Sequence, residues 1–477
     1  MIPPTARSSA EPPLCVDLDG TLIRTDTLYE SLLVLLKTNP LWAFLLPVWL
    51  ARGKANFKRQ IASRVVLDAS TLPYHPELLA HLRRERAGGR RLVLVSAADE
   101  RVVRTVAEHL RLFDDVIASD GARNLKGANK RAILSARFGS GGYDYAGDHP
   151  ADLAVWADAR GAIVVSADDR LARRAGDRVR QTFVSPRRPL RALARALRVQ
   201  QWVKNALVFV PLLMSPEARE LPRFGSAFLA LVAFSLAASS VYVLNDLLDL
   251  AADRRHATKR SRPFAAGELP LVLGFALAPA CLAAAIAIGA LLPRAFLMVL
   301  ALYMITTTAY SFRLKHVPLV DVIVLALLYT GRVIAGAAAT RVWPSPWLLG
   351  FSLFFFVSLA FVKRYSELHA LRDQRSLQVR GYFPADLELI ATNGTVSGYL
   401  SVLVAALYIN SDRVVPLYRH PEMLWFVCPL LMYWISRIWL LAHRGELHDD
   451  PVLFAIKDRV SYVVGALVAL VLVLARF

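Results

Sequence analysis

Three aspartates in the middle of the chain are spaced so that their side chains share one helical face. They are Asp246, Asp249 and Asp253, and they follow an apolar run from Phe228 to Leu244. Residues three or four positions apart lie one turn above each other on a helix. Carboxylates crowded at the end of a membrane span repel one another and are costly to desolvate unless a divalent cation joins them. The spacing therefore predicts a Mg²⁺ site.

Cationic side chains come directly after the aspartates. They are Arg254, Arg255, His256, Lys259 and Arg262. Arginine and lysine donate charge-assisted hydrogen bonds to phosphate oxygens. Together with the carboxylates they indicate a Mg²⁺-diphosphate site. The plainer alternative is a helix end that carries ordinary solvated charges.

The composition is that of an integral membrane protein. The chain has 477 residues, of which 55% are hydrophobic, and several long runs are almost free of charge. Its net charge of +19 would indicate nucleic-acid binding in a soluble protein, but positive-inside loops and anionic headgroups explain it more simply, so we expect no nucleic-acid partner. Cys15, Cys281 and Cys428 have no metal or disulfide spacing. Met1 to Pro13 lacks the features of a signal peptide, so we expect the first domain to stay cytosolic.

The first part of the chain, 1–185, has the pattern of a soluble α/β domain. Short apolar runs at Leu14–Val16, Arg91–Val95, Tyr143–Ala146 and Ala162–Val165 predict strands. Strands alternating with helical segments favour a doubly wound parallel sheet, whose sites lie at the carboxyl ends of the strands. The charged motifs of this domain fall at those ends.

Four of these motifs resemble the haloacid dehalogenase (HAD) phosphatase superfamily, in the order that the superfamily has them. They are Asp17-x-Asp19-Gly20-Thr21, Ser96, a lysine after Asn124-Leu125-Lys126-Gly127, and Gly147-Asp148-x-x-x-Asp152. Lys126 and Lys130 both fit the third motif, and Lys130 is preferred because it follows the loop by about one helical turn. An inactive domain kept for stability is the alternative.

The resemblance implies a role for each of these side chains. Asp17 would be the nucleophile, and Asp19 would protonate the leaving oxygen and later activate water. Ser96 and Lys130 would hold the phosphoryl oxygens. Mg²⁺ would be bound at Asp17, Asp19 and Asp148, with Asp152 supporting.

A helical insert at about 28–86 is expected to cap the phosphatase site. It contains the apolar run Leu41–Leu50, which is too short to span a membrane and is interrupted by Pro47. Two interpretations remain open for this run: it dips into the membrane interface, or it forms a buried core within the cap.

A basic amphipathic linker, 186–200, is predicted to join this domain to a transmembrane domain, 201–477, and to lie on an anionic membrane surface. Nine apolar segments follow, the first being Ala206–Met214. With the first domain cytosolic, the loops richest in Lys and Arg face the cytosol, which agrees with the positive-inside rule. These loops are Asp246–Glu268, Arg313–His316, Lys363–Arg380 and His443–Arg459.

Further charged clusters occur in or beside these loops. They are Tyr310 to Lys315 with Asp321 and Arg332, Lys363 and Arg364 with Arg380, and Asp449-Asp450 with Asp458-Arg459. Each could be a solvated loop. A charge inside or bordering a membrane span is more often functional, which applies to Arg332 and Lys363.

The second half of the chain resembles the UbiA superfamily of intramembrane prenyltransferases. Within it, the likeness is to the decaprenyl-phosphate phosphoribosyltransferases (DPPR synthases) of cell-wall arabinan precursor synthesis. The residues that carry the likeness are Gln201 to Asn205 with Lys204, Asn245 to Arg254, Tyr310-Ser311 with Lys315, Lys363-Arg364-Tyr365, and Asp458-Arg459. Quinone-type members usually have paired aspartates in the second motif, whereas Asp321 here stands beside cations.

The resemblance implies a bifunctional enzyme of the inner membrane with both sites on the cytoplasmic side. The transferase would bind 5-phosphoribosyl-1-diphosphate (PRPP) through Mg²⁺ on the three aspartates, with Asn245 orienting the metal shell. Lys259, Arg262 and Lys315 would neutralise pyrophosphate, and Lys363, Arg364 and Arg380 would seat the lipid phosphate or the ribose 5-phosphate. A polyprenyl phosphate would be the acceptor, and the HAD domain would remove the 5-phosphate to give polyprenylphosphoryl ribose. A homo-oligomer is possible.

Two rival functions are compatible with the same residues. One is an aromatic prenyltransferase of quinone synthesis with a phosphatase acting on a separate substrate. The other is a lipid-phosphate carrier or scaffold that binds at both sites without chemistry.

Overall fold

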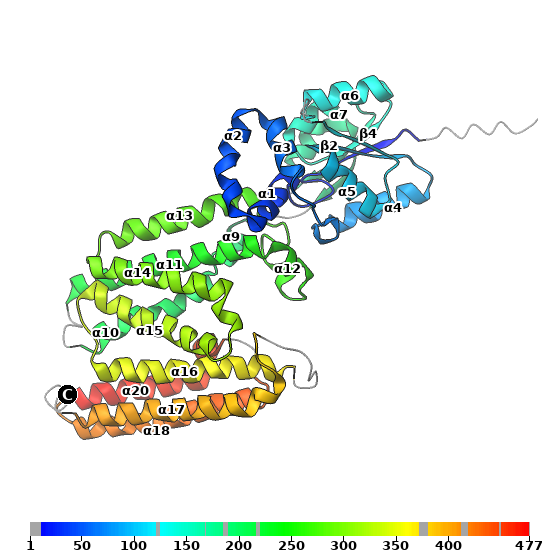
Figure 1. Cartoon of the computed structure of the whole chain (residues 1–477). Helices are drawn as coiled ribbons and strands as arrows, with labels where there is room; N and C mark the ends of the chain where they lie inside the picture. The colour runs from blue at the N-terminus through cyan, green and yellow to red at the C-terminus, as the bar shows by residue number, and fades with distance from the viewer. Residues whose placement is uncertain are drawn as a thin grey trace, which may run out of the picture. The chain divides into compact units, whose positions relative to one another are not determined.

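The computed structural model divides the chain into two compact units, and each unit is built from two separate stretches of sequence. The first, here called the α/β unit, is Met1–Ala196 with Tyr242–Leu277. The second, the helical unit, is Leu197–Val241 with Ala278–Phe477. Figure 1 labels many of their helices and some of the strands. The stretch Tyr242–Leu277, here called the membrane-loop segment, thus packs with the α/β unit although it lies within the apolar half of the sequence.

The structure describes residues 11–120, 125–166, 168–184, 189–215, 220–371, 380–411, 418–447 and 450–476. Some residues discussed above lie outside these ranges. They are Asn124, Asp449, most of the joint before the linker helix, and the middle of the loop between Lys363 and Arg380.

Six parallel strands form one sheet, in the order β3-β2-β1-β4-β5-β6. The strands are β1 (Leu14–Asp17), β2 (Leu92–Asp99), β3 (Asp115–Ser119), β4 (Asp144–Gly147), β5 (Gly161–Ser166) and β6 (Val179–Val184). Strand β1 pairs with both β2 and β4, so its carboxyl end lies between theirs. This confirms the predicted α/β parallel sheet. The sequence pattern does not predict the two edge strands, β3 and β6. Strand β3 begins at the charged residue Asp115, and β6 contains Arg180 and Gln181.

The sheet has an apolar core on each face. Leu14 and Val16 belong to one cluster and Cys15 to the other, because successive strand side chains point to opposite faces. The helices of the α/β part are α1 (Thr27–Thr38), η1 (Pro40–Leu45), α2 (Leu46–Ala51), α3 (Lys54–Ala62), η2 (Ala69–Thr71), α4 (Pro76–Ala87), α5 (Glu100–Leu110), α6 (Ala128–Phe138), η3 (Pro150–Asp152), α7 (Leu153–Trp156), α8 (Arg170–Ala175), η4 (Gly176–Arg178) and α9 (Pro189–Ala196).

The cap is the helical stretch from α1 to α4, which connects β1 to β2. Its apolar run divides between two environments. Trp49 packs with Leu35 and Ile61 in a small core, whereas Leu41 and Phe44 are 67% and 78% exposed. A buried cap core therefore accounts for only part of the run.

Eight helices in the described part of the chain are long and apolar enough to cross a membrane. They are α11 (Leu221–Leu248), α13 (Leu271–Gly289), α14 (Arg294–Phe312), α15 (Val320–Thr340), α16 (Pro346–His369), η9 with α17 (Pro384–Ile409), η11 with α18 (Pro421–His443) and α20 (Arg459–Arg476). The sequence pattern predicts nine membrane-spanning segments. The expected first segment, Ala206–Met214, is instead divided between η5 (Val199–Phe209) and α10 (Val210–Leu213), which are too short to span.

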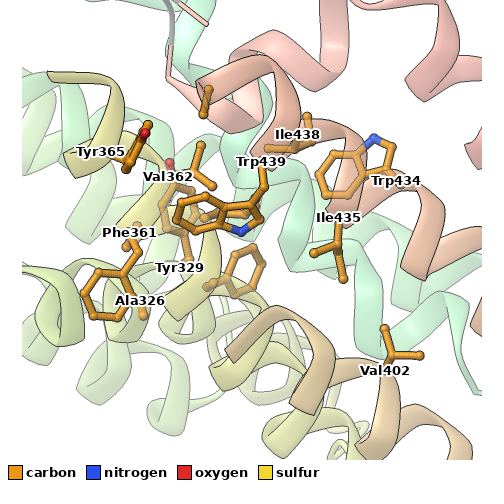
Figure 2. Packing of buried hydrophobic residues seen from close by; sticks show 14 of the residues in the cluster. Ala326, Tyr329, Phe361, Val362, Tyr365, Val402, Trp434, Ile435, Ile438 and Trp439 are labelled. Carbon is orange, nitrogen blue, oxygen red and sulfur yellow. The ribbon is translucent and has the colours of Figure 1, made fainter. Parts of the chain in front are cut away.

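Large aromatic and branched side chains fill the core of the helical unit, as Figure 2 shows around Trp439, Ile435 and Phe361. Helix α17 lies close to both α16 and α18 at Gly394, where an added Cβ would lie 2.2 Å from Trp439 of α18 and 2.7 Å from Phe361 of α16. Segment η5 is packed equally closely against α15, because a Cβ on Gly336 would lie 1.9 Å from the carbonyl oxygen of Val208. The contact at Gly336 fixes the relative position of the polar residues carried by η5 and α15.

Candidate active sites

An acidic cluster lies at the carboxyl ends of two neighbouring strands of the sheet. Asp17 ends β1, while Asp148 and Asp152 follow β4. One carboxylate oxygen from each of the three lies within 4.8 Å of the others. Carboxylate oxygens are the ligands that Mg²⁺ prefers, so this donor set fits such an ion.

Lys130, on α6, is the cation that faces this cluster. Its Nζ lies 2.9 Å from Asp17 Oδ1, 3.9 Å from Asp152 Oδ1 and 2.6 Å from the hydroxyl of Tyr145. Burial favours the neutral forms of both Asp17 and Lys130. It raises the pKa of Asp17, although the positive charge of Lys130 acts in the opposite direction. Burial also opposes the charge on Lys130, but Asp17 and Asp152 outweigh it and raise the pKa of the amine.

Asp19 lies two residues beyond Asp17 and accepts a hydrogen bond from the backbone N–H of Thr27 at 2.7 Å. Burial, together with the nearby charge of Asp26, raises the pKa of Asp19 to about 8. The carboxyl group therefore carries a proton at neutral pH and can donate it to a leaving oxygen.

Gly20 and Thr21 hold Asp148 against the strand end. Gly20 has a φ of +81°, and a Cβ at this position would lie 2.2 Å from Asp148 Oδ2. Thr21 Oγ1 donates a hydrogen bond to Asp148 Oδ1 at 3.0 Å. The glycine of the Asp-x-Asp-Gly-Thr motif is thus required both by its backbone conformation and by the close approach of a carboxylate.

Ser96 and Lys126, two candidates for holding phosphoryl oxygens, do not contact the acidic cluster in the way that Lys130 does. Ser96 is fully buried, and its Oγ accepts a hydrogen bond from Ala98 N–H at 3.0 Å. At this strand end the cavity wall is formed by Ala97 and Ala98. Lys126, the other candidate for the third motif, lines the cavity.

Sequence reasoning missed Lys58, a cap residue that reaches the same cavity. Its Nζ donates to the carbonyl oxygen of Ala97 at 2.6 Å. Burial lowers the pKa of Lys58, although the charges of Asp19 and Asp26 partly offset this. A single lysine in a helical insert has no motif around it, so only its position in the fold identifies it.

The cavity in front of the cluster has a volume of about 390 Å³ and is lined by both charged and apolar residues. Asp17, Asp19 and Lys130 are among the charged ones. Elsewhere its wall includes Leu28 and Tyr29 of the cap, together with Gly267, Pro270, Leu271 and Val272 of the membrane-loop segment.

The aspartate-rich stretch of the membrane-loop segment is not one continuous helix. Helix α11 ends at Leu248, and a new short helix, α12 (Leu250–Arg255), begins after Asp249. Asp246 and Asp253 are buried and Asp249 is exposed. The three carboxylates therefore do not lie on one face of a continuous helix, as predicted, because the helix is interrupted at Asp249.

The guanidinium of Arg262 lies between the two buried carboxylates. Its Nη1 is 3.1 Å from Asp246 Oδ1 and 2.6 Å from Asp253 Oδ2. The pair thus converges on a positive charge, and its oxygens are chemically suited to Mg²⁺. Lys259, in η7 (Lys259–Ser261), is exposed, and Asn245 lies in the last turn of α11.

In the helical unit, two predicted lysines converge on one carboxylate. Asp450 Oδ2 lies 2.8 Å from Lys204 Nζ and 3.3 Å from Lys363 Nζ, and Tyr329 donates to Asp450 at 3.1 Å. Burial opposes the charge on Asp450, but the two lysines outweigh it and hold the pKa of the carboxyl well below its usual range.

A second buried network surrounds Arg332. Arg332 Nε donates to Asn205 Oδ1 at 2.8 Å, and Asn205 Nδ2 in turn donates to Ser235 at 2.9 Å. Nη2 of the arginine lies 3.3 Å from the hydroxyl of Tyr303. The network links η5, α11, α14 and α15 through a charge that is only 6% exposed.

A third cluster joins Arg364, Arg380 and Tyr310. Arg364 Nε lies 2.5 Å from Asp321 Oδ2, and its guanidinium also contacts Glu367. Both arginines donate to the hydroxyl of Tyr310, at 3.2 and 2.9 Å. Lys315, in η8 (Leu314–His316), is half-buried and belongs to no ion pair found among the described residues.

Comparison with known proteins assigns the larger part of the chain. Residues 206–472 match the model of the UbiA prenyltransferase family. The chain belongs to the UbiA prenyltransferase family. Residues 14–157 match haloacid dehalogenase-like hydrolases, so a HAD-like domain precedes the UbiA domain.

Three relatives show how far these similarities extend. "Uncharacterized protein y4nM" of Sinorhizobium fredii is 39% identical over 97% of this chain and 91% of its own length. "Nodulation protein NoeC" of Azorhizobium caulinodans is 35% identical over 58% of this chain and 90% of its own length. The "Decaprenyl-phosphate phosphoribosyltransferase" of Mycobacterium tuberculosis is 36% identical over 56% of this chain and 88% of its own length. This UbiA-family chain is therefore a multi-pass membrane protein with a HAD-like domain.

Proposed function

We propose that this chain is a bifunctional enzyme of polyprenylphosphoryl ribose synthesis. Its UbiA domain transfers 5-phosphoribose from PRPP to a polyprenyl phosphate, and its HAD-like domain then removes the 5-phosphate. Both reactions take place on the cytoplasmic side of the inner membrane. The transferase half of the proposal rests on the similarity to the mycobacterial phosphoribosyltransferase.

In the transfer step, an oxygen of the polyprenyl phosphate forms a bond to ribose C1 while the bond from C1 to pyrophosphate breaks, with inversion at C1. The attacking phosphate is already an anion at neutral pH, so no protein base is required. Catalysis then consists of alignment and charge neutralisation. Asp246 and Asp253 would hold Mg²⁺, which supplies positive charge for the departing pyrophosphate.

The remaining cations divide into two groups in this proposal. Arg262, Lys259 and Lys315 neutralise the pyrophosphate. Arg364 and Arg380, which already share the hydroxyl of Tyr310, form a paired site for the other phosphate. Arginine suits such a site because its planar donors match phosphate oxygens.

In the phosphatase step, a carboxylate oxygen of Asp17 attacks the phosphorus and the bond to the ribose 5-oxygen breaks. Asp19 gives its proton to that oxygen, and later takes a proton from the water that attacks the aspartyl-phosphate. Lys130 holds Asp17 and the phosphoryl oxygens in line. Asp17 and Asp148 would hold Mg²⁺, which supplies positive charge at the phosphoryl group.

One observation carries the link between the two activities. The cavity that contains Asp17 and Asp19 is also lined by Leu271 and Val272, the first residues of membrane helix α13. A phosphatase for soluble metabolites does not require a wall made by a membrane helix. Such a wall suits a phosphatase for a lipid-linked sugar phosphate, because its substrate remains anchored in the bilayer.

The test supplies the purified protein with labelled PRPP, Mg²⁺ and a polyprenyl phosphate and follows the lipids by mass spectrometry. Wild-type protein should give the dephosphorylated lipid, and Asp17→Asn should accumulate the lipid that retains the 5-phosphate. Asp177→Asn, at an exposed aspartate outside the motifs, is the matched control and should behave as wild type. Absence of ribose label in the lipids would refute the transferase half, and accumulation of the phosphorylated lipid by wild-type protein would refute the phosphatase half.

A further inference from the structure

The cap carries a contiguous set of large apolar side chains that the fold leaves uncovered. Among the described residues of η1 and α2, Leu41, Phe44, Leu45, Val48 and Leu50 are 40% to 78% exposed. We call these five residues the cap patch. Soluble surfaces rarely keep so many large apolar side chains together within ten residues, and such patches usually mark an interaction site.

The opposite side of the same segment is firmly packed. Trp42 and Trp49 are 5.6 Å apart between ring centroids, and Arg64 lies over both rings at 5.1 and 4.8 Å. Trp49 also packs with Leu35 and Ile61. The segment is therefore amphipathic, and its inner face fixes the direction in which the cap patch points.

Charge around the cap patch has one sign. Between Glu30 and Asp68 the sequence contains no aspartate or glutamate, whereas it contains Lys37, Arg52, Lys54, Lys58, Arg59 and Arg64. Lys54, Arg52 and Lys37 flank the segment that bears the patch and are not fully buried. An apolar face bordered by exposed cations complements a bilayer with anionic headgroups.

The helix that precedes the cap patch contacts the ends of two membrane helices. Lys37 Nζ, in the last turn of α1, donates at 3.0 Å to the carbonyl oxygen of Leu248, the last residue of membrane helix α11. The ring of Tyr29, near the start of α1, lies 6.1 Å from that of Phe275 in membrane helix α13. Since these are the points at which α11 ends and α13 begins, helix α1 leads the chain to the membrane boundary.

We propose that the cap patch inserts into the lipid interface, with its flanking cations at the headgroups of the leaflet. The segment Pro40–Ala51 has 12 residues, which at about 1.5 Å per residue is too short to cross a bilayer. It lies in the plane of the interface instead, with its apolar side about 5–10 Å into the headgroup boundary. The bilayer thereby becomes part of the support of the cap, whose Lys58 and Leu28 line the phosphatase cavity.

The experiment measures the depth of single spin labels on the full-length protein in nanodiscs that contain phosphatidylglycerol. Native Cys15, Cys281 and Cys428, all buried, are replaced with alanine. Labels are then attached at Phe44→Cys and, separately, at Val48→Cys. Glu108→Cys, an exposed site on α5, is the matched control.

Labels at Phe44 and Val48 should collide with oxygen more often than with a water-soluble nickel complex, and should report a depth of about 5–10 Å. The order should be reversed at Glu108. Equal nickel access at all three sites would overturn the proposal. Low access to both reagents together with dipolar broadening between labels would also overturn it, because a second copy of the chain would then cover the patch. Each outcome is independent of whether the protein transfers phosphoribose.

Discussion

Arg254 donates hydrogen bonds to both carboxylate oxygens of Glu30, at 3.1 and 2.6 Å, and so joins the aspartate-rich stretch to the first helix of the cap. The two side chains are 7% and 6% exposed. Glu30 also accepts a hydrogen bond from Thr25 at 2.8 Å, and Thr25 lines the cavity that contains Asp17 and Asp19. The buried ion pair of Arg254 and Glu30 therefore connects the aspartate-rich stretch to the wall of the cavity that contains Asp17.

Removing one partner of this pair should destabilise the α/β unit. Arg254→Gln leaves Glu30 buried without its counter-charge, which typically costs about 3–5 kcal/mol. We expect a lower midpoint of thermal unfolding and a parallel loss of hydrolysis of a soluble phosphate monoester. The double variant Glu30→Gln with Arg254→Gln should lose less stability than Arg254→Gln alone, because no charge remains unpaired. Equal losses would show that the charge of the pair is not what matters.

Lys130 and Lys126 should differ sharply in their effect on the phosphatase. Lys130→Met removes the amine 2.9 Å from the Asp17 carboxylate, and we expect hydrolysis to fall about 10²–10³-fold. Lys126→Met, the control at the cavity wall, should cost much less. Phosphoribosyl transfer, followed by the appearance of phosphorylated lipid, should persist in both variants. A larger loss with Lys126→Met would assign the third motif to that residue.

The raised pKa of Asp19 predicts how stability depends on pH in the metal-free protein. A carboxyl group of an unfolded chain titrates near pH 4, whereas Asp19 in the fold titrates at about 8. Between these values the folded protein holds a proton that the unfolded chain has released, so the free energy of unfolding should fall as pH rises. Asp19→Asn cannot release that proton, and its unfolding midpoint should fall less between pH 5 and 8 in EDTA.

Asp177→Asn serves as the control for this titration, since it removes an exposed carboxyl group. Its unfolding midpoint should follow the wild-type pH dependence. Parallel curves for wild type and Asp19→Asn would show that Asp19 titrates as an ordinary carboxyl group.

Asp246→Asn should abolish transfer while leaving the phosphatase able to hydrolyse a soluble monoester. The change removes a charged oxygen donor and one of the two carboxylates that contact Arg262. The measurement is ribose label in lipid as Mg²⁺ is titrated, and EDTA should stop transfer by the wild type. Glu446→Gln, at an exposed position of a loop, is the control. Transfer by Asp246→Asn at the wild-type Mg²⁺ requirement would contradict the proposed metal site.

Gly394→Ala should destabilise the helical unit. A Cβ at this position would lie 2.2 Å from the Trp439 ring, and overpacking of this kind costs about 1–3 kcal/mol. Gly465→Ala is the matched control, because a Cβ there meets no atom within 4 Å. It should be neutral or stabilising by up to about 1 kcal/mol, since alanine favours the helix. Thermal unfolding in one detergent compares the two, and equal midpoints would contradict the close packing of α17 on α16 and α18.

The parts of the fold that sequence could predict are those with strong local patterns. The apolar run before Asp17 and the run before Ser96 are short, dense and followed by motif residues, so the sequence predicts β1 at nearly the right bounds and β2 at nearly the right start, although β2 continues to Asp99. Strand β6 was not predicted, because Arg180 and Gln181 interrupt its apolar pattern at the edge of the sheet. The apolar run Ala206–Met214 is predicted to be a membrane span from its hydropathy alone. Hydropathy does not report that η5 ends at Phe209, or that η5 packs closely against α15 at Val208 and Gly336.

The residues of the sites were predictable and their partners were not. Motif spacing identified Asp17, Asp148 and Lys130, which the structure brings together. It did not identify Glu30 as the partner of Arg254, because the two are 224 residues apart and Glu30 belongs to no motif. Contacts of this kind depend on how distant segments pack, and a single sequence does not encode them in any local pattern.

The composition of the α/β unit has a consequence for the order of events during synthesis. A ribosome completes the last strand of the sheet, β6, long before it makes Gly267 and Leu271, and the two stretches are separated by residues of the helical unit. The cavity around Asp17 consequently lacks part of its wall until helix α11 has been translated and the chain has reached the start of α13. A nascent chain released before that point would carry every HAD-like motif and still have an incomplete pocket.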